Sequence, residues 1–209
     1  HKALREVVGT HVQQAGSLVD PDKLRFDFSH YEAVTAEQLA KIENIVNEKI
    51  REGIDVVVSH HSIEEAKNLG AMMLFGDKYG EVVRVVDVPG FSTELCGGTH
   101  IDNIAKIGLF KIVSEGGIAA GVRRIEAKTG YGAYLVEKEE ADTLKEIEKK
   151  LKASNTNVVE KVEKTLESLK DAEKSLETLK QKIALFETKA ALSGMEEING
   201  AKVLIATDR

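Results

Sequence analysis

The last third of the chain constrains its fold most, because it contains no proline from about Tyr134 to Ser193. Apolar residues recur there every seven positions, at Val162, Leu169, Leu176, Ile183 and Ala190. Three positions after the middle three of these are further apolar residues, Ala172, Leu179 and Phe186. Positions a and d of a heptad predict a long helix with one apolar stripe. Before the polar break Ser154–Asn157, a similar spacing is seen at Leu144, Ile147 and Leu151. We therefore predict a long antiparallel helical hairpin.

The first 131 residues show a different pattern, in which helical and strand periods alternate. Thr35 and Gln38 form a capping-box signature, and the helix they begin is expected to run to about Glu52, before Gly53. The alternation over Leu24–Phe28 is typical of a strand. Further helices are predicted over Lys2–Val8 and Ile63–Leu69, and strands over Asp55–Val58 (buried), Val82–Val88, Leu109–Val113 and Val122–Ala127. This order predicts an α+β domain with a mixed sheet and helices.

Composition excludes several classes of protein. The 209 residues contain one cysteine, so an intramolecular disulfide is excluded, and no apolar run approaches the roughly 18 residues of a membrane span. We expect a reducing cytoplasmic location and no membrane partner. The net charge of −6 argues against indiscriminate nucleic-acid binding. One basic stretch is either a solvated strand face or a nucleic-acid contact, and it contains Lys106, Lys111, Arg123, Arg124 and Lys128.

The only cysteine is joined to a histidine through a glycine-rich turn, Cys96-Gly97-Gly98-Thr99-His100. A thiolate and an imidazole are both zinc ligands, and two glycines let the backbone fold tightly enough for both to reach one ion. The alternative is a structural cysteine beside an unrelated histidine. A complete tetrahedral site needs two more ligands, or one more and a water.

The surrounding segments resemble the second additional, or editing, domain of alanyl-tRNA synthetases. The segments that carry the resemblance are Ala3–Val7, His11–Val19, Leu24–His30, Phe75–Gly80, Val82–Val86, Gly90–His100 and Gly121–Glu126. The resemblance covers about the first 130 residues. It implies an editing domain over residues 1–131 that lacks its N-terminal part, a helical linker over 132–193, and over 194–209 the first strand of a truncated C-terminal domain, expected at Gly200–Ala206.

The same resemblance implies the residues of the site. In the family, a His-x-x-x-His helix completes the zinc site, and its two histidines are expected upstream of His1, so that Cys96 and His100 are two of four ligands. Substrate contacts are expected from Gln14, Gly97, Gly98 and Thr99; without the family, Gln14 is a turn residue before Gly16. Contacts to tRNA are expected from Lys78, Arg123 and Arg124. Because strand neighbours point to opposite faces, we expect only one of the two arginines to reach a phosphate.

The implied function is hydrolysis of mischarged Ser-tRNA(Ala) and Gly-tRNA(Ala) as part of an alanine–tRNA ligase, with the acceptor end of tRNA(Ala) as partner. The alternatives are a free-standing alanyl-tRNA editing protein and a non-catalytic module for tRNA binding or dimerisation. A homodimer through the helical arm or the C-terminal domain is one expectation. Nothing in the chain resembles an ATP site, so ATP and Mg are expected only in an aminoacylation domain outside it.

The general base stays open at this point. Glu65 and Asp87 are candidates, but no spacing singles either out. His60 and His61 follow a predicted strand, and recruitment of one of them to a metal is a further alternative.

Overall fold

The structure is a computed structural model of residues 1–209. It describes residues 1–73, 80–193, 195–198 and 200–203. The contacts divide the chain into two units, His1–Glu140 and Ala141–Arg209. Over the described ranges, no helix is both long and apolar enough to cross a membrane.

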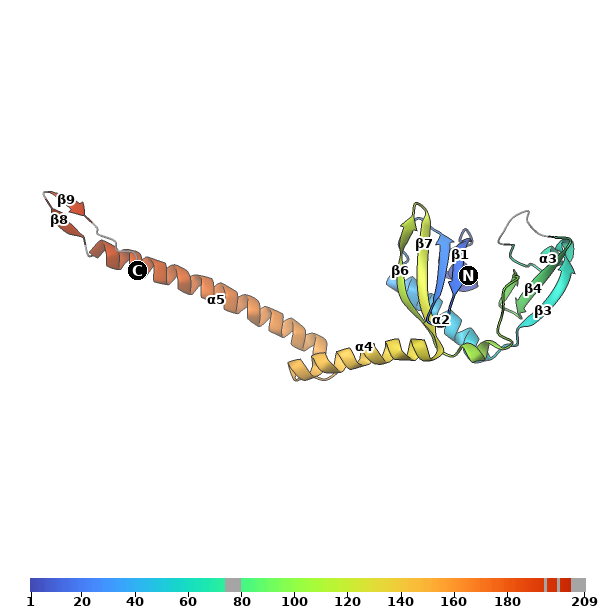
Figure 1. Ribbon diagram of the computed structural model, residues 1–209. Coiled ribbons are helices and arrows are strands. Elements are labelled where there is room, and N and C mark those ends of the chain that lie inside the picture. The colour runs from blue at the N-terminus through green and yellow to red at the C-terminus, as the bar shows by residue number, and fades with distance from the viewer. Residues whose placement is uncertain (74–79, 194, 199, 204–209) are drawn as a thin grey trace. The chain divides into compact units, whose positions relative to one another are not determined.

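The first unit contains two antiparallel sheets (Figure 1). The four-stranded sheet has the order β1-β2-β7-β6, formed by Gln14–Val19, Leu24–Ser29, Val122–Thr129 and Phe110–Ala119. The three-stranded sheet has the order β3-β4-β5, formed by Val57–Ser62, Val82–Val88 and Ser92–Leu95. The helices are α1 (Lys2–Val7), α2 (Ala36–Glu52), α3 (Ile63–Asn68) and the 3₁₀ helix η1 (Ile104–Ile107). The predicted α+β class is confirmed.

The main core lies between α1, α2 and one face of the four-stranded sheet. Phe28 on β2 and Ile125 on β7 are buried against Leu4 of α1 and Ile42 of α2. This arrangement follows from the strand period, because alternate side chains of a strand point to one face. A second, smaller cluster packs α3 on the three-stranded sheet and contains Ala66, Val83, Val85 and Leu95.

Helix α2 begins and ends as its sequence predicts. The Thr35 hydroxyl accepts from the Gln38 amide at 3.2 Å, and the Thr35 amide donates to the Gln38 side chain at 2.9 Å. Gly53 ends the helix in the left-handed region, with φ of 64°. In the middle of α2, Asn47 exchanges two hydrogen bonds with the backbone of Phe110, at 2.8 and 2.9 Å, and so joins the helix to β6.

The segments that enter and leave the three-stranded sheet lie side by side. The Ile104 amide donates to Ile54 at 3.0 Å, and the Val56 amide donates to Asp102 at 2.8 Å. The Asn103 side chain donates to the Gly53 backbone and to Asp55, both at 2.7 Å. These hydrogen bonds join residues 53–56 to residues 102–104, where the chain enters and leaves the three-stranded sheet.

Two predicted strands differ from the observed ones. The buried strand expected over Asp55–Val58 is wrong: β3 begins at Val57, and Val57 and Val58 are 48% and 45% exposed. Strand β3 is an edge strand, so a run of apolar residues there does not require burial on both faces.

The strand expected over Leu109–Val113 continues to Ala119. Gly116 and Gly117 do not end it, because they pair with Arg124 and Arg123 of β7. Local glycine content indicated a turn, and the cross-strand hydrogen bonds extended the strand.

The tail contains the two predicted helices, α4 (Gly130–Leu151) and α5 (Val158–Ser193). They are separated at the predicted break, where Lys152 has φ of 51° and Asn157 accepts from the Ser154 amide at 2.8 Å. The structure does not show the predicted antiparallel packing, because heptad residues of α5 such as Leu169, Ile183 and Phe186 are exposed. At about 1.5 Å per residue, the 22 residues of α4 could cover only the first part of the 36-residue α5, so length alone leaves Ile183 and Phe186 without a partner from α4.

After α5 the chain forms a short hairpin of β8 (Glu196–Ile198) and β9 (Ala201–Val203). The strand expected at Gly200–Ala206 corresponds in part to β9, and its residues 204–206 lie outside the described residues. The predicted domain boundaries at 131 and 193 stay predictions.

Candidate functional site

The Cys96–His100 turn follows β5 and is held by an arginine of the neighbouring strand. Nη1 of Arg84 on β4 donates to the backbone oxygens of Cys96 and Gly98, both at 2.7 Å. The Cys96 amide in turn donates to the Arg84 oxygen at 3.2 Å. The turn is thus bound at both ends of the Cys96–Gly98 segment, and the Cys96 side chain is partly exposed.

His100 lies in an environment that favours the neutral imidazole. Partial burial lowers the pKa of His100, the positive charge of Arg84 lowers it further, and Glu94 offsets part of the effect. A neutral imidazole is the form that binds a metal. A thiol and a neutral imidazole at the two ends of one turn therefore fit a zinc ion as half of its ligand set.

Glu94 also lies near the start of α1. Glu94 and His1 both line a small cavity of about 160 Å³. Glu94 therefore lies near His1, and its charge also acts on His100.

Gly97 and Gly98 are exposed, and the protein itself does not require glycine at either position. A Cβ atom on Gly97 would have no neighbour within 4 Å, and one on Gly98 would lie 3.6 Å from Sγ of Cys96, an ordinary contact. Neither residue has the positive φ that favours glycine. Thr99 is exposed beside them. The two glycines leave the backbone of the turn open to approach from solvent.

Gln14 is the first residue of β1, in the other sheet, and is not the turn residue of the alternative interpretation. A β-bulge follows it, between Gln14 and Gly16. Its Nε2 donates to the Ser17 hydroxyl at 3.1 Å. Within the described residues, no hydrogen bond joins Gln14 to the Cys96–His100 turn, and its role in substrate binding stays a prediction.

Arg123 and Arg124 point to opposite faces of β7, as the strand period predicts, and each meets a carboxylate. Arg123 pairs with Glu115 of β6, where Nη2 donates to Oε2 at 2.9 Å. Arg124 pairs with Asp27 of β2 through two bonds of 2.7 and 2.9 Å. A phosphate would therefore compete with a carboxylate for either guanidinium. Lys78, the third predicted tRNA contact, lies outside the described residues.

The candidate bases have structural partners. Glu65 accepts from the amide and the hydroxyl of Ser62, both at 2.9 Å, and completes the capping box of α3. Asp87 accepts from the Thr93 hydroxyl at 2.7 Å across β4 and β5. His61 lies 2.9 Å from the Ser59 hydroxyl. In the part of the chain that is described, no group of three or more His, Cys, Asp or Glu side chains could hold a metal.

An apolar cavity of about 630 Å³ lies beneath the four-stranded sheet, against α2. None of the predicted site residues that the structure describes lines it. Sequence reasoning missed Arg84 and Glu94. Arg84 could have been noticed in the sequence as the one cation within the β-branched run Val82–Val88. For Glu94, only its position two residues before Cys96 pointed to the site.

Comparisons with known proteins agree with the resemblance. A family model described as the threonyl and alanyl tRNA synthetase second additional domain matches residues 83–126. The chain is 86% identical over 206 residues to an alanine–tRNA ligase of Fusobacterium nucleatum, and 50% identical over 206 residues to one of Bacillus anthracis. A third relative, from Listeria welshimeri, is 53% identical over 204 residues.

These matches cover 98–99% of this chain but only 23–24% of the relatives. The chain therefore spans about a quarter of the length of the curated relatives that it matches. Sequence similarity over nearly the whole chain, the matching family model and the α+β fold agree. This chain belongs to the alanyl-tRNA synthetase family, in which it corresponds to a segment that includes the second additional domain.

Proposed function

We propose that the chain serves the editing reaction of an alanine–tRNA ligase, the hydrolysis of the ester that joins serine or glycine to tRNA(Ala). A pocket for alanine discriminates poorly against one added hydroxyl or one missing methyl, by about 10–200-fold, so a second, hydrolytic site is needed for accuracy. The similarity to alanine–tRNA ligases over nearly the whole chain supports this assignment.

The observation that carries the proposal is the Arg84-bound turn with its thiol, its imidazole and two glycines that the protein does not require. Glycine at 97 and 98 is explained if a ligand approaches the backbone there. The amides of the turn would then contact the aminoacyl group, with Thr99 beside it. Gln14 would contact the substrate from β1, because the donor bond to Ser17 leaves its Oε1 as an acceptor.

Zinc is the metal that this donor set fits. Cys96 and His100 would hold two of its four positions, and the other two ligands would be the histidines expected upstream of His1. A helix that continued α1 before His1 would adjoin the cavity that His1 shares with Glu94, whose charge also acts on His100. A bound zinc ion supplies a Lewis acid that polarises an ester carbonyl or a water molecule. Arg84 would hold the thiol and imidazole at their positions through the turn backbone.

Contacts to tRNA complete the proposal. The acceptor end would lie near the turn, and Lys78 with one of Arg123 and Arg124 would contact phosphates. ATP and Mg would belong to an aminoacylation domain outside this chain, and the cytoplasmic location stays a prediction.

The test places this chain in the Fusobacterium nucleatum ligase in exchange for the matching segment, which is 86% identical. Deacylation of Ser-tRNA(Ala) and zinc content are measured for Cys96→Ala, His100→Ala and the control His61→Ala. Loss of a metal ligand removes several kcal/mol of transition-state stabilisation, so the first two variants should lose deacylation by about a hundredfold or more, together with zinc. The control should retain both.

Unchanged deacylation in a folded Cys96→Ala protein would disprove the proposed site. Deacylation by the isolated chain, with no ligase attached, would favour the free-standing editing protein instead. Zinc binding without deacylation would leave the non-catalytic module as the better description.

A second role rests on the exposed stripe of α5. Leu169, Leu176, Leu179 and Ile183 are each more than half exposed. A heptad stripe of this length is stabilised when a second helix covers it. We propose that α5 pairs with α5 of a second copy, which makes the arm a dimerisation element beside the editing domain.

A further inference from the structure

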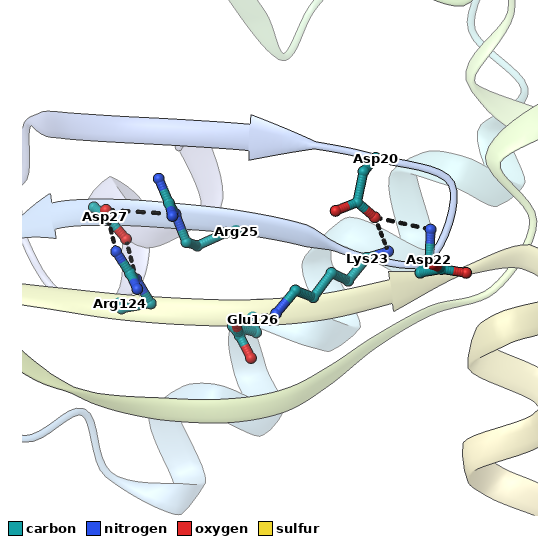
Figure 2. A network of polar contacts seen from close by, with 7 residues as sticks. All are labelled: Asp20, Asp22, Lys23, Arg25, Asp27, Arg124 and Glu126. Atoms are coloured by element: carbon teal, nitrogen blue, oxygen red, sulfur yellow. Dashed lines mark hydrogen bonds and ion pairs between the residues drawn. The ribbon is translucent and has the colours of Figure 1, made fainter.

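One face of the four-stranded sheet is not used by the core. On β2, Phe26 and Phe28 point toward α1 and α2, so Arg25 and Asp27 point to the opposite face. The strand register places Asp27 opposite Arg124 and Arg25 opposite Glu126 on β7. Figure 2 shows these side chains, with helix ribbons behind the strands. Antiparallel sheets often leave such a face to solvent.

Asp27 is already bound by one of its two arginine neighbours. Nε and Nη2 of Arg124 donate to the two carboxylate oxygens at 2.7 and 2.9 Å. Nε of Arg25 lies 3.6 Å from Oδ2 of Asp27, beyond hydrogen-bond distance. This nitrogen is buried, and among the described residues it has no hydrogen-bond partner.

The charges on this face do not balance. Lys23 binds Glu126 at 2.7 Å, and Arg124 binds Asp27, so two cations are paired with two carboxylates (Figure 2). Arg25 is the third cation and has only the long ion pair to the occupied Asp27. Its side chain keeps 31% of its surface exposed. Among these five side chains, Arg25 is the cation without a closely bound carboxylate, and Lys128, two residues after Glu126 on β7, adds a further positive charge to the same face.

The surroundings of Arg25 suit a nucleic-acid backbone. Leu18 lies opposite Arg25 on β1 and is 45% exposed, which offers an apolar contact for a ribose or a base. Gly16, opposite Asp27, adds no side chain over the carboxylate. A guanidinium binds phosphate in a fork geometry, and one common RNA-binding module binds single-stranded RNA on the face of a four-stranded sheet.

We propose that Arg25 binds a backbone phosphate of RNA on the open face of the four-stranded sheet. The inference rests on the proposed function, which makes RNA the ligand of this chain, and it adds a contact surface to the turn and to the basic residues named above. Arg124 assists by neutralising Asp27, which would otherwise repel the phosphate.

The test uses the full chain and a hairpin RNA that ends in single-stranded CCA, with binding measured by fluorescence anisotropy over a series of salt concentrations. Each phosphate contact contributes about 0.7–0.9 to the slope of log affinity against log salt, so its loss at 0.1 M salt weakens binding about five- to eightfold. Arg25→Gln should show both effects. Arg25→Lys, which keeps the charge, should retain the slope.

A variant that is expected to tighten RNA binding distinguishes a lost contact from a loss of folding. Glu126→Gln removes a carboxylate from the same face and frees Lys23, so it should tighten binding by a similar factor. The matched control is Lys138→Gln, because Lys138 is an exposed cation on α4 and its loss changes the net charge equally. The control should change affinity by less than about twofold, through long-range charge alone.

Unchanged affinity and slope in a folded Arg25→Gln chain, or equal weakening by Lys138→Gln, would overturn the inference. So would a wild-type chain that does not bind the hairpin. Deacylation of Ser-tRNA(Ala) by the chimeric ligase is a separate readout, so the proposed editing function stands or falls independently of this result.

Discussion

Arg84 donates a hydrogen bond of 2.7 Å to the backbone oxygen of Cys96, and the same nitrogen donates to Gly98. Strand β4 thereby holds the turn that carries the candidate zinc ligands. The bond replaces the water that an exposed carbonyl would bind, and it limits the positions that Sγ of Cys96 can take. Arg84 is therefore a positioning residue for the proposed site.

Replacement of Arg84 should weaken metal binding without removing a ligand. Mutation of a residue that orients a metal ligand without binding the metal itself typically lowers metal affinity about 10–100-fold. We expect a loss of zinc affinity of that size for Arg84→Ala in the chimeric ligase. Competition with a chelator measures it. Arg51→Ala, an exposed arginine at the end of α2, is the control. Wild-type zinc affinity in a folded Arg84→Ala protein would contradict the positioning role.

Asn47 should be important for stability. Its amide satisfies both the N–H and the C=O of Phe110, at 2.9 and 2.8 Å, so Asn47→Ala leaves two partly buried backbone groups without partners. Each unmet group costs about 1–3 kcal/mol, and we expect a total loss of about 2–4 kcal/mol in urea unfolding. Asn44→Ala, an exposed asparagine on the same helix, should lose less than about 0.5 kcal/mol. Equal losses for both variants would refute the assignment.

Stability should depend on pH through Asp27. Hydrogen bonds from Arg124 lower the pKa of Asp27, burial opposes this shift, and the positive charges of Arg124 and Arg25 add to it. Because the folded pKa lies below the unfolded value near 4, the stabilisation is present above that value and is lost as pH falls through the folded pKa.

Asp27→Asn should therefore destabilise the chain by about 2 kcal/mol at pH 7, and the difference from wild type should shrink below about pH 4. Urea unfolding at pH 7, 5 and 3 checks this. Asp22→Asn, an exposed aspartate in the β1–β2 turn, provides the baseline. A difference that stays constant down to pH 3 would mean that Asp27 acts by packing alone.

Pairing of α5 predicts a change in oligomeric state. Leu176 and Ile183 are 55% and 57% exposed, and lysine at both positions would place charge in the centre of a two-helix seam. Sedimentation equilibrium should show a wild-type dimer and a monomeric double variant. Thr178→Lys with Gln181→Lys, outside the stripe on the same helix, should leave the dimer intact. A wild-type chain that remains monomeric at every concentration would exclude this role for the arm.

Several elements were predictable because their signals are local. The capping box of Thr35 and Gln38, the left-handed Gly53 and the β-branched run Val82–Val88 each act within a few residues, and the structure has them at the expected positions. The break at Ser154–Asn157 is local in the same sense. Propensity and capping determine such features before the chain packs.

Other elements depended on neighbours distant in the sequence. The apolar pair Val57–Val58 was predicted to be buried, but β3 lies at a sheet edge. The strand expected over Leu109–Val113 is longer in the structure, because Gly116 and Gly117 pair with β7 and extend it. The antiparallel packing predicted for the tail is absent, because a heptad stripe specifies that a helix needs a partner without specifying which one.

By itself the sequence determined the chemistry of the candidate site: a thiol and an imidazole separated by two glycines and a threonine, in a chain of the alanyl-tRNA synthetase family. Only the tertiary structure decided that Arg84 holds this turn through hydrogen bonds. It also decided that Arg124 binds the carboxylate of Asp27, so that Arg25 has no closely bound carboxylate. The physical reason is that residue type and spacing are written along the chain. Hydrogen bonds between distant residues depend instead on strand order and register, which are established when the sheets form.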